Sequence, residues 1–319
     1  MNSLALASPA SESHHLAAPV PGPEALLESF LAAQDVSDAS RGTYRRELLQ
    51  FFAWLAENTP AGRALETEDL LRFKGSLAAR GLAPLTVTNY VVAVRKFFAW
   101  CSSKNLYPDI ARGLKGAKRS RDFRKDPLTI EQAKDLLASV DRTTPEGKRD
   151  FALVNLLLRT ALRTIEVVRA DVGDLRQIGG EAKLFVQGKG RDDKDEFVVL
   201  TPATLGPLRE YLQTRGPLAD AEPLFVSSSN RNAGGRLTTR SLRRIVKGAL
   251  AGISIVDRRI TTHSTRHTAI TLSLKGGATL QEAQALARHA NINTTLLYAH
   301  NLDRVNNAAE RRIDALLGA

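Results

Sequence analysis

Apolar side chains recur at helical spacing along most of the chain, and this pattern predicts a mainly helical protein. In the N-terminal third it predicts helices over 24–34, 40–58, 67–80 and from 84 to about 105. The second and fourth of these share an aromatic pattern, because Phe51-Phe52-Ala53-Trp54 is echoed by Phe97-Phe98-Ala99-Trp100. Two helices of one bundle would bury such equivalent faces together, so we expect a helical bundle over residues 23–111.

The period changes in the second half of the chain. Residues 184–187 and 196–200 are short strand-like runs joined by a polar loop, which predicts a small antiparallel β-sheet. A capping-box pattern, Thr129-x-x-Gln132, predicts a helix start before it. Further helices are expected over 148–162, 202–214, 238–251, 264–274, 280–287, 294–298 and 302–317. The second domain, from residue 126 onward, is therefore predicted to be mainly α with this small sheet inserted early.

The two predicted domains are separated by a basic linker over residues 112–125. With Arg112 it holds seven basic side chains against Asp122 alone, a net charge of +6. The residues that we expect to contact DNA are Lys115, Lys118, Arg119, Arg121, Arg124 and Lys125. Such a run is often merely solvated, but between two domains of a basic protein it also suits a phosphate backbone. Residues 1–22, rich in Ala, Ser, Pro and His, are predicted to be a disordered tail.

The charge of the whole chain favours a polyanionic partner. The 319 residues carry a formal net charge of +11, although residues 1–40 contain five acidic and no basic side chains. The remainder therefore carries +16, which is typical of proteins that bind nucleic acid or an anionic surface. The single cysteine, Cys101, excludes an intramolecular disulfide and a cysteine-based zinc site. No apolar run is long enough to cross a membrane, and we expect a cytoplasmic, nucleoid-associated protein.

Four stretches carry candidate chemistry. They are the segment around Arg163, the Gly188-Lys189-Gly190 loop, His263-Ser264-Thr265-Arg266-His267, and the segment from His289 to Tyr298. Each has an ordinary explanation by itself: Arg163 can pair with Glu166, the glycine loop can be a hairpin turn, and Tyr298 can simply pack.

Together these residue types suit the cleavage of a phosphodiester. Two arginines offer forked donors to the phosphoryl oxygens, and a tyrosine hydroxyl is a competent covalent nucleophile. A lysine on a loop can protonate the leaving oxygen, and histidines can bind phosphate or move a proton. No carboxylate cluster with metal-site spacing accompanies them, so we expect no metal.

The order Arg163, Lys189, His263-x-x-Arg266, His289, Tyr298 resembles that of the tyrosine recombinase (phage-type integrase) family. The Arg163 stretch is similar to the Gly-Leu-Arg-x-Ser-Glu box, and residues 263–267 to the His-x-Leu-Arg-His box. The segment from His289 to Tyr298, with Thr294-Thr295 inside, resembles the box that carries the nucleophile. The resemblance implies a tyrosine recombinase catalytic fold over 126–301 and a SAM-like, core-binding domain over 23–111. It also implies that the C-terminal helix, within residues 302–319, packs on a neighbouring protomer.

The resemblance further implies a site-specific DNA recombinase. Tyr298 would attack a scissile phosphate, form a 3′-phosphotyrosyl link and release a 5′-hydroxyl, with strand exchange through a Holliday junction. Arg163, Arg266 and His289 would hold the phosphate, His263 would assist proton transfer and Lys189 would protonate the leaving oxygen. No cofactor, metal or ATP is implied. The implied partners are double-stranded DNA recombination sites, on which a monomer would assemble as a homotetramer, and no membrane.

Several points stay open at this stage. The hairpin loop is longer than the family's commonest pattern, so Lys194 is a rival to Lys189. Ile165 replaces the usual Ser, and Arg288 stands where the family has Gly. Arg288 can add a backbone contact or only face solvent, and we expect it to face solvent. A type IB topoisomerase shares the chemistry, and a non-enzymatic DNA-binding protein shares the charge. We favour an Xer-like or transposon-type enzyme, but phage integrase, transposon enzyme and chromosome-dimer resolvase all stay possible. The sequence does not give the DNA sequence of the target site.

Overall fold

The computed structural model describes residues 22–60, 62–118, 126–188, 191–257, 259–306 and 309–318. The chain divides into two compact units, with the boundary near residue 122. In the part of the chain that the structure describes, no helix combines the length and the apolar character needed to cross a membrane. Each unit has its own hydrophobic core.

The first unit is the predicted helical bundle. Its helices are α1 (Pro23–Ala32), α2 (Asp38–Asn58), α3 (Thr67–Ala79) and α4 (Pro84–Ser103). The repeated aromatic faces of α2 and α4 do pack on each other: the rings of Phe52 and Phe97 lie 5.3 Å apart, and those of Phe51 and Phe98 6.2 Å. Both pairs meet edge to face, the favourable geometry for aromatic rings. This packing confirms the explanation of the sequence repeat as two helices of one bundle.

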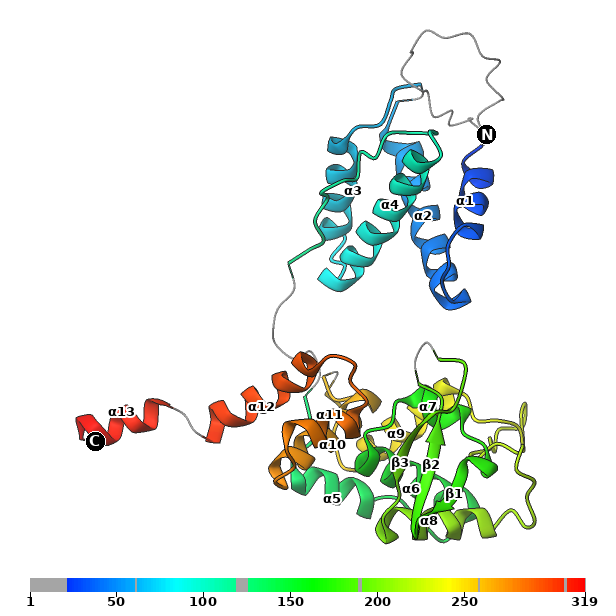
Figure 1. Ribbon diagram of the computed structural model, residues 1–319, viewed down its shortest axis with the longest axis vertical. Helices are drawn as coiled ribbons and strands as arrows, with labels where there is room; N and C mark the ends of the chain where they lie inside the picture. The colour runs from blue at the N-terminus through cyan, green and yellow to red at the C-terminus, as the bar shows by residue number, and fades with distance from the viewer. Residues whose placement is uncertain are drawn as a thin grey trace. The chain divides into compact units, whose positions relative to one another are not determined.

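The second unit is mainly helical and contains a small sheet (Figure 1). Its elements in order are α5 (Ile130–Ala138), α6 (Pro145–Thr160), α7 (Thr164–Arg169), the 3-10 helix η1 (Val172–Asp174), β1 (Leu175–Ile178), β2 (Glu181–Val186), β3 (Glu196–Val199), α8 (Pro202–Gln213), α9 (Thr239–Gly252), α10 (Thr262–Lys275), α11 (Leu280–Ala287), α12 (Ile292–Asn306) and α13 (Ala309–Leu317). The predicted capping box opens α5, since Thr129 and Gln132 each bond the other's backbone N–H. The mainly α fold class with a small antiparallel sheet is confirmed.

The sheet has one strand more than the sequence pattern predicted. It is antiparallel in the order β1-β2-β3, with Leu184 of β2 opposite Leu175 on one side and Val198 on the other. Strand β1 was missed because its sequence, Leu-Arg-Gln-Ile, is short and half polar, so its alternation is too weak to recognise. The turn before β2 is made by Gly179 and Gly180, both with positive φ.

Helix α6 forms the centre of this unit and sets up the site. Its residues Leu153, Val154, Leu156 and Leu157 are fully buried, and it packs against α8 and α10. The helix ends at Thr160, and its C-cap residue, Ala161, takes a left-handed conformation with φ of 52°. The chain therefore turns sharply after α6, and Arg163 becomes the N-cap of α7. A short loop thus presents the first candidate arginine beside α10.

The C-terminal helices differ from the predicted boundaries. Separate helices were predicted over 294–298 and 302–317, but α12 runs without a break from Ile292 to Asn306, and α13 follows from Ala309. The sequence explains the continuity, because neither glycine nor proline occurs between residues 292 and 306. Tyr298 therefore shares one helix with the residues that lead to α13.

Candidate active site

Arg266 of α10 is the structural centre of the site. Arg266 is 2% exposed, and its guanidinium donates hydrogen bonds to the carbonyl oxygens of Ala161 and Ala287. Burial, and then the positive charges of Arg163 and Arg288, lower the pKa of Arg266 to about 10. It remains charged at neutral pH. Arg266 therefore joins the loop before Arg163 to the loop before His289.

Arg163 is oriented by the buried carboxylate of Glu166 in the same turn of α7. Its backbone N–H donates to Glu166 Oε2 and its Nη1 donates to Oε1, both at 2.7 Å. The side chain of Glu166 is fully buried while that of Arg163 is 28% exposed. The ion pair of Arg163 with Glu166, which by itself would give Arg163 a purely structural role, is present. It nevertheless leaves part of the Arg163 guanidinium at the surface of the site.

Tyr298 is buried on α12 and contacts a histidine that the sequence analysis gave no role. Its hydroxyl oxygen lies 2.7 Å from Nδ1 of His267, within hydrogen-bond distance. Burial raises the pKa of Tyr298 to about 12, although the positive charges of Arg266 and Arg163 act in the opposite direction. Burial also lowers the pKa of His267 to about 4, so its imidazole is neutral at neutral pH. The hydroxyl is therefore protonated and held against a neutral ring.

His289 is held by a residue from the same box of sequence. Its Nδ1 lies 2.9 Å from the hydroxyl oxygen of Thr295, a fully buried residue on α12. Desolvation, followed by the charges of Arg266 and Arg163, lowers the pKa of His289 to about 4. These two arginines act electrostatically on both His289 and Tyr298, whose rings lie 6.2 Å apart, so the structure brings all four side chains close together.

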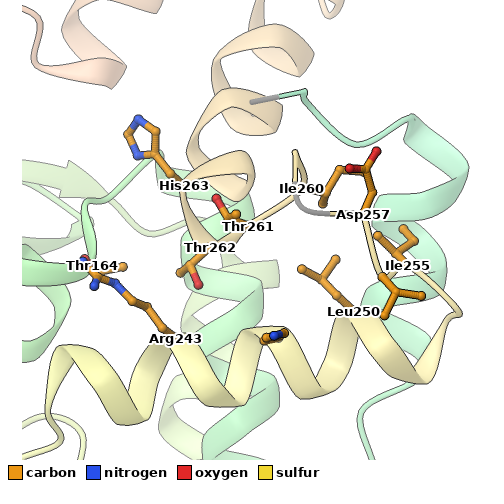
Figure 2. Close-up of a pocket in the computed structure, with 11 residues that line it drawn as sticks. Thr164, Arg243, Leu250, Ile255, Asp257, Ile260, Thr261, Thr262 and His263 are labelled. Carbon is orange, nitrogen blue, oxygen red and sulfur yellow. The ribbon is translucent and has the colours of Figure 1, made fainter. Parts of the chain in front are cut away.

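His263 is exposed at the start of α10, where it lines a neighbouring cavity of about 610 Å³ (Figure 2). Figure 2 shows Arg243 of α9 on the wall of this cavity, and Lys247 lines it too. Helix α9 buries Leu242, Val246 and Leu250 and exposes basic side chains on its outer side. The exposed basic residues are Arg240, Arg243, Arg244 and Lys247. This basic helix was not among the predicted DNA-binding residues, although the amphipathic spacing of its side chains is visible in the sequence.

The two candidate lysines of the hairpin loop, Lys189 and Lys194, differ in their surroundings. Lys189 lies outside the described residues, but its neighbours Gly188 and Arg191 line a cavity of about 920 Å³ together with Arg163 and His289. Lys194 instead pairs with two carboxylates, those of Asp171, at 2.6 Å, and Asp174. These acidic partners hold the pKa of Lys194 above its usual value in spite of desolvation. A lysine bound in this way is a poor proton donor to a leaving oxygen.

The structure corrects the expectation for Arg288. We expected this side chain to face solvent, which is wrong: it is 5% exposed and donates to the buried Glu166 at 2.9 Å. The only signal in the sequence was the departure from the family's glycine.

In the linker, Lys115 and Lys118 are exposed, whereas Arg119, Arg121, Arg124 and Lys125 lie outside the described residues.

Comparison with known sequences gives matches over both units. A profile of the Phage integrase family matches residues 127–304, and one of the phage integrase N-terminal SAM-like domain matches 24–105. A tyrosine recombinase of Synechococcus elongatus is 30% identical over 274 residues, covering 82% of this chain and 84% of that protein. Tyrosine recombinase XerD of Listeria innocua is 30% identical over 282 residues, covering 86% and 90%.

Solved structures share the fold. The XerH site-specific recombinase bound to palindromic difH substrate aligns with a TM-score of 0.72 at 21% identity, over 90% of this chain and 84% of that one. The Tn1549 transposon integrase in complex with transposon right end DNA aligns with a TM-score of 0.68 at 16% identity, over 91% and 98%. At these identities the likeness shows the fold alone.

Proposed function

This chain belongs to the phage integrase family of tyrosine recombinases, which carry out site-specific DNA recombination, and we propose that it cuts and rejoins DNA through a phosphotyrosyl intermediate on Tyr298. One observation carries the proposal. Arg266 bridges the loops that bear Arg163 and His289, and the charges of both arginines reach the buried hydroxyl of Tyr298. A nucleophile beside two phosphate-binding arginines is the arrangement that phosphoryl transfer requires.

The proposed first step is an in-line displacement at phosphorus. The Tyr298 oxygen forms a bond to the scissile phosphorus, and the bond from phosphorus to the 5′-oxygen breaks. Arg163, Arg266 and His289 donate to the phosphoryl oxygens, on which negative charge increases in the transition state. Lys189 gives its proton to the leaving 5′-oxygen. The phosphotyrosyl bond conserves the energy of the broken bond, so a 5′-hydroxyl from a partner duplex can reverse the step without ATP.

The proton of Tyr298 must leave during this attack. With a pKa of about 12, the hydroxyl is not ionised beforehand at neutral pH. The two arginines stabilise the negative charge that develops on the phenol oxygen, and we assign His263, on the exposed first turn of α10, to assist the transfer of the proton to water. His267, which is neutral and 2.7 Å from the hydroxyl, orients the oxygen before DNA arrives. Repetition on the second pair of strands would pass through a Holliday junction.

Two basic surfaces are proposed to hold double-stranded recombination sites. The exposed side chains of Arg243, Arg244 and Lys247 on α9 lie next to the cavity that His263 lines, so DNA bound there would reach the catalytic residues. The linker residues Lys115, Lys118, Arg119, Arg121, Arg124 and Lys125 would neutralise phosphates between the two units. Phosphate contacts position a protein on DNA without reading its sequence, so we assign both surfaces to affinity rather than to sequence preference.

We further propose that the active form is a homotetramer on DNA, assembled from monomers. Ile313, Leu316 and Leu317 of α13 are 52%, 87% and 79% exposed and lie on one face by their spacing. An exposed apolar helix face of this kind favours docking on another chain. The catalytic domain would accordingly span 126–301 and the exchanged segment 302–319, with an Xer-like or transposon-type role.

Trapping of the covalent intermediate tests the proposed chemistry. A suicide duplex carries a nick close to the scissile phosphate, so the freed 5′-end diffuses away and the protein stays attached to the 3′-end. We expect a denaturation-resistant protein–DNA adduct with the intact chain and none with Tyr298→Phe, which keeps the ring but lacks the nucleophile. DNA binding without any adduct would favour the non-enzymatic alternative. Relaxation of supercoiled DNA that bears one site, without two-site recombination, would favour a type IB topoisomerase.

A further inference from the structure

Lys194 fastens the loop between β2 and β3 to the body of the second unit. Its Nζ lies 2.6 Å from Asp171 Oδ2 and also contacts Asp174 Oδ2. The side chains of Lys194 and Asp171 are each 25% exposed, and that of Asp174 is 7% exposed, so both ion pairs are largely shielded from solvent. A shielded cation between two carboxylates holds its place more firmly than an isolated ion pair at the surface does.

The two carboxylates are themselves fixed by further contacts. Asp174 Oδ2 accepts a hydrogen bond from the backbone N–H of Asp171 at 2.7 Å, which closes the turn of η1. Asp171 Oδ1 accepts from the guanidinium of Arg236, which also donates to the carbonyl oxygen of Ala170 at 3.1 Å. Because each carboxylate has a second partner in the fold, Lys194 is attached to a rigid point.

This rigid point follows directly on the helix that Arg163 caps. Arg163 is the N-cap of α7, and Asp171 comes two residues after the last residue of that helix. Both α7 and η1 pack against β2, the strand that leads into the loop. The ion pairs of Lys194 therefore connect the loop to the same segment that presents a phosphate-binding arginine.

The opening end of the loop lies at the active site. Gly188 lines the same cavity as Arg163. The backbone N–H of Arg191 donates to the carbonyl oxygen of Gly188 at 3.3 Å, and the side-chain amide of Gln187 donates to the carbonyl oxygen of Arg191 at 2.8 Å. The loop is thus held together near Gly188 and anchored to η1 at Lys194, so a change at Lys194 can be felt at the active site.

We propose that Lys194 is a positioning residue: its ion pairs with Asp171 and Asp174 fix the loop so that Lys189 can reach the leaving 5′-oxygen. This inference rests on the proposed function, which assigns the proton donor to Lys189. Lys194 keeps its own proton in this role and acts through the loop, without touching DNA. A role of Lys194 as the proton donor itself would also make it necessary for cleavage, so the experiment must distinguish anchoring from donation.

The experiment compares two leaving atoms in single-turnover adduct formation at saturating protein. One suicide duplex has the normal 5′-oxygen at the scissile phosphate, and the other has a bridging 5′-sulfur. When the bond from phosphorus to sulfur breaks, sulfur leaves as a thiolate, a much weaker base than an alkoxide, so it needs no proton. K189M should slow cleavage of the oxygen duplex about 10²–10⁴-fold, the usual contribution of a general acid, and should spare the sulfur duplex.

K194M removes the charge of Lys194 but keeps a long side chain. It should slow cleavage of the oxygen duplex about tenfold to a hundredfold, the usual cost of misplacing a reacting group, and spare the sulfur duplex. D171N/D174N, which removes the charges of both partners, should show the same pattern. K134M is the matched control, because Lys134 on α5 is exposed and makes no ion pair among the described residues; it should leave both rates unchanged.

K194R distinguishes anchoring from proton donation. A guanidinium can pair with both carboxylates but keeps its proton, because its pKa lies above about 12. We therefore expect K194R to cleave the oxygen duplex faster than K194M does. K194R as slow as K194M would overturn the inference in favour of Lys194 as the donor. A K194M variant that cleaves the oxygen duplex at the rate of the intact chain, or that loses equal activity on both duplexes, would overturn it as well.

The proposed function fails separately from this inference. It fails if the intact chain forms no adduct that depends on Tyr298, whatever the variants at Lys194 do. The assignment of Lys189 as the proton donor fails if K189M cleaves the oxygen duplex as fast as the intact chain does. Thermal unfolding of each variant, measured alongside, shows whether a slower rate accompanies a loss of the fold.

Discussion

At the scale of single residues, the two catalytic arginine candidates have unequal structural duties. Arg266 is buried and bonds two backbone carbonyls, so it holds loops together as well as charging the pocket. Arg163 is partly exposed, and its guanidinium is anchored by the carboxylate of Glu166. Loss of a buried partner leaves polar groups unsatisfied, whereas loss of an exposed one does not. Substitutions at the two positions should therefore differ in their effect on folding.

Arg163→Lys and Arg266→Lys should both lower the cleavage rate about 10²–10³-fold, because an ammonium lacks the forked donor geometry that a phosphoryl group requires. DNA affinity should change little for Arg163→Lys. Arg266→Lys should in addition lower the melting temperature, since one of its two carbonyl partners loses its donor. The measurements are single-turnover adduct formation, DNA affinity and thermal unfolding. Near-wild-type cleavage by both variants would show that the phosphate pocket lies elsewhere.

The lowered pKa values of two histidines predict how the stability of the fold depends on pH. The pKa values of His267 and His289 fall to about 4 in the folded protein, from about 6.5 in an unfolded chain. Between these values the unfolded chain binds more protons, so the free energy of unfolding decreases as pH falls from about 6.5 towards 4. His267→Gln should weaken the fall of melting temperature between pH 7 and 5. Equal slopes for His267→Gln and the intact chain would contradict the assignment.

At the scale of elements, α12 connects the nucleophile to the C-terminal helix. It carries Tyr298 in its second turn and continues to Asn306, with α13 beginning at Ala309. A continuous helix transmits displacement along its axis better than a flexible loop does. Docking of α13 on a neighbouring protomer would therefore influence where Tyr298 lies. In this way only some protomers of an assembly would be able to cleave DNA at one time.

Disruption of the apolar face of α13 should separate assembly from DNA binding. Leu316→Asp combined with Ile313→Asp places charges where a docked helix would meet an apolar surface, which is costly when buried. We expect unchanged solubility and single-site DNA binding, together with loss of two-site synapsis and recombination in gel and electron-microscopy assays. Asp314→Ala, on the same helix and also exposed, is the matched control. Recombination by the double variant at the intact protein's rate would rule out exchange in trans.

At the scale of the whole molecule, two folded units are joined by a strongly basic segment. Each unit has a separate core, and residues 112–125 contribute a net charge of +6 between them. Two weak DNA-binding modules that share a short linker bind more tightly together than either does alone, because the second encounter is intramolecular. Much of the affinity should then come from phosphate contacts that are independent of sequence.

Binding should therefore depend steeply on salt. The logarithm of the binding constant should fall against the logarithm of salt concentration with a slope of about −0.9 per phosphate contact. Replacement of Arg119, Arg121 and Arg124 by glutamine should make this slope shallower by about 0.9 for each phosphate that is no longer neutralised. The same replacement should weaken binding to site and non-site DNA alike. Fluorescence anisotropy titrations at several salt concentrations measure both effects, and a slope near zero for the intact chain would exclude binding through phosphate contacts.

The local patterns of the sequence were sufficient for most of the elements and for a hypothesis about which side chains react. Helical periodicity located the bundle and its repeated aromatic faces, and the order of Arg163, Arg266, His289 and Tyr298 indicated phosphate chemistry before any fold was known. Periodicity reports on neighbours three or four residues apart, and motif order reports on residue type. Both are properties of the linear chain, so the sequence determined them.

Tertiary packing decided which side chains meet. Tyr298 contacts His267 across 31 residues of sequence, and Arg288 reaches Glu166 across 122. Such pairs depend on how α10, α11 and α12 pack and on where α6 ends, and no short pattern records that. The same packing attached Lys194 to two carboxylates and buried an arginine that its sequence position suggested would be solvated. A buried charge is tolerated only where the fold supplies its partner, and the fold alone determines whether that partner is present.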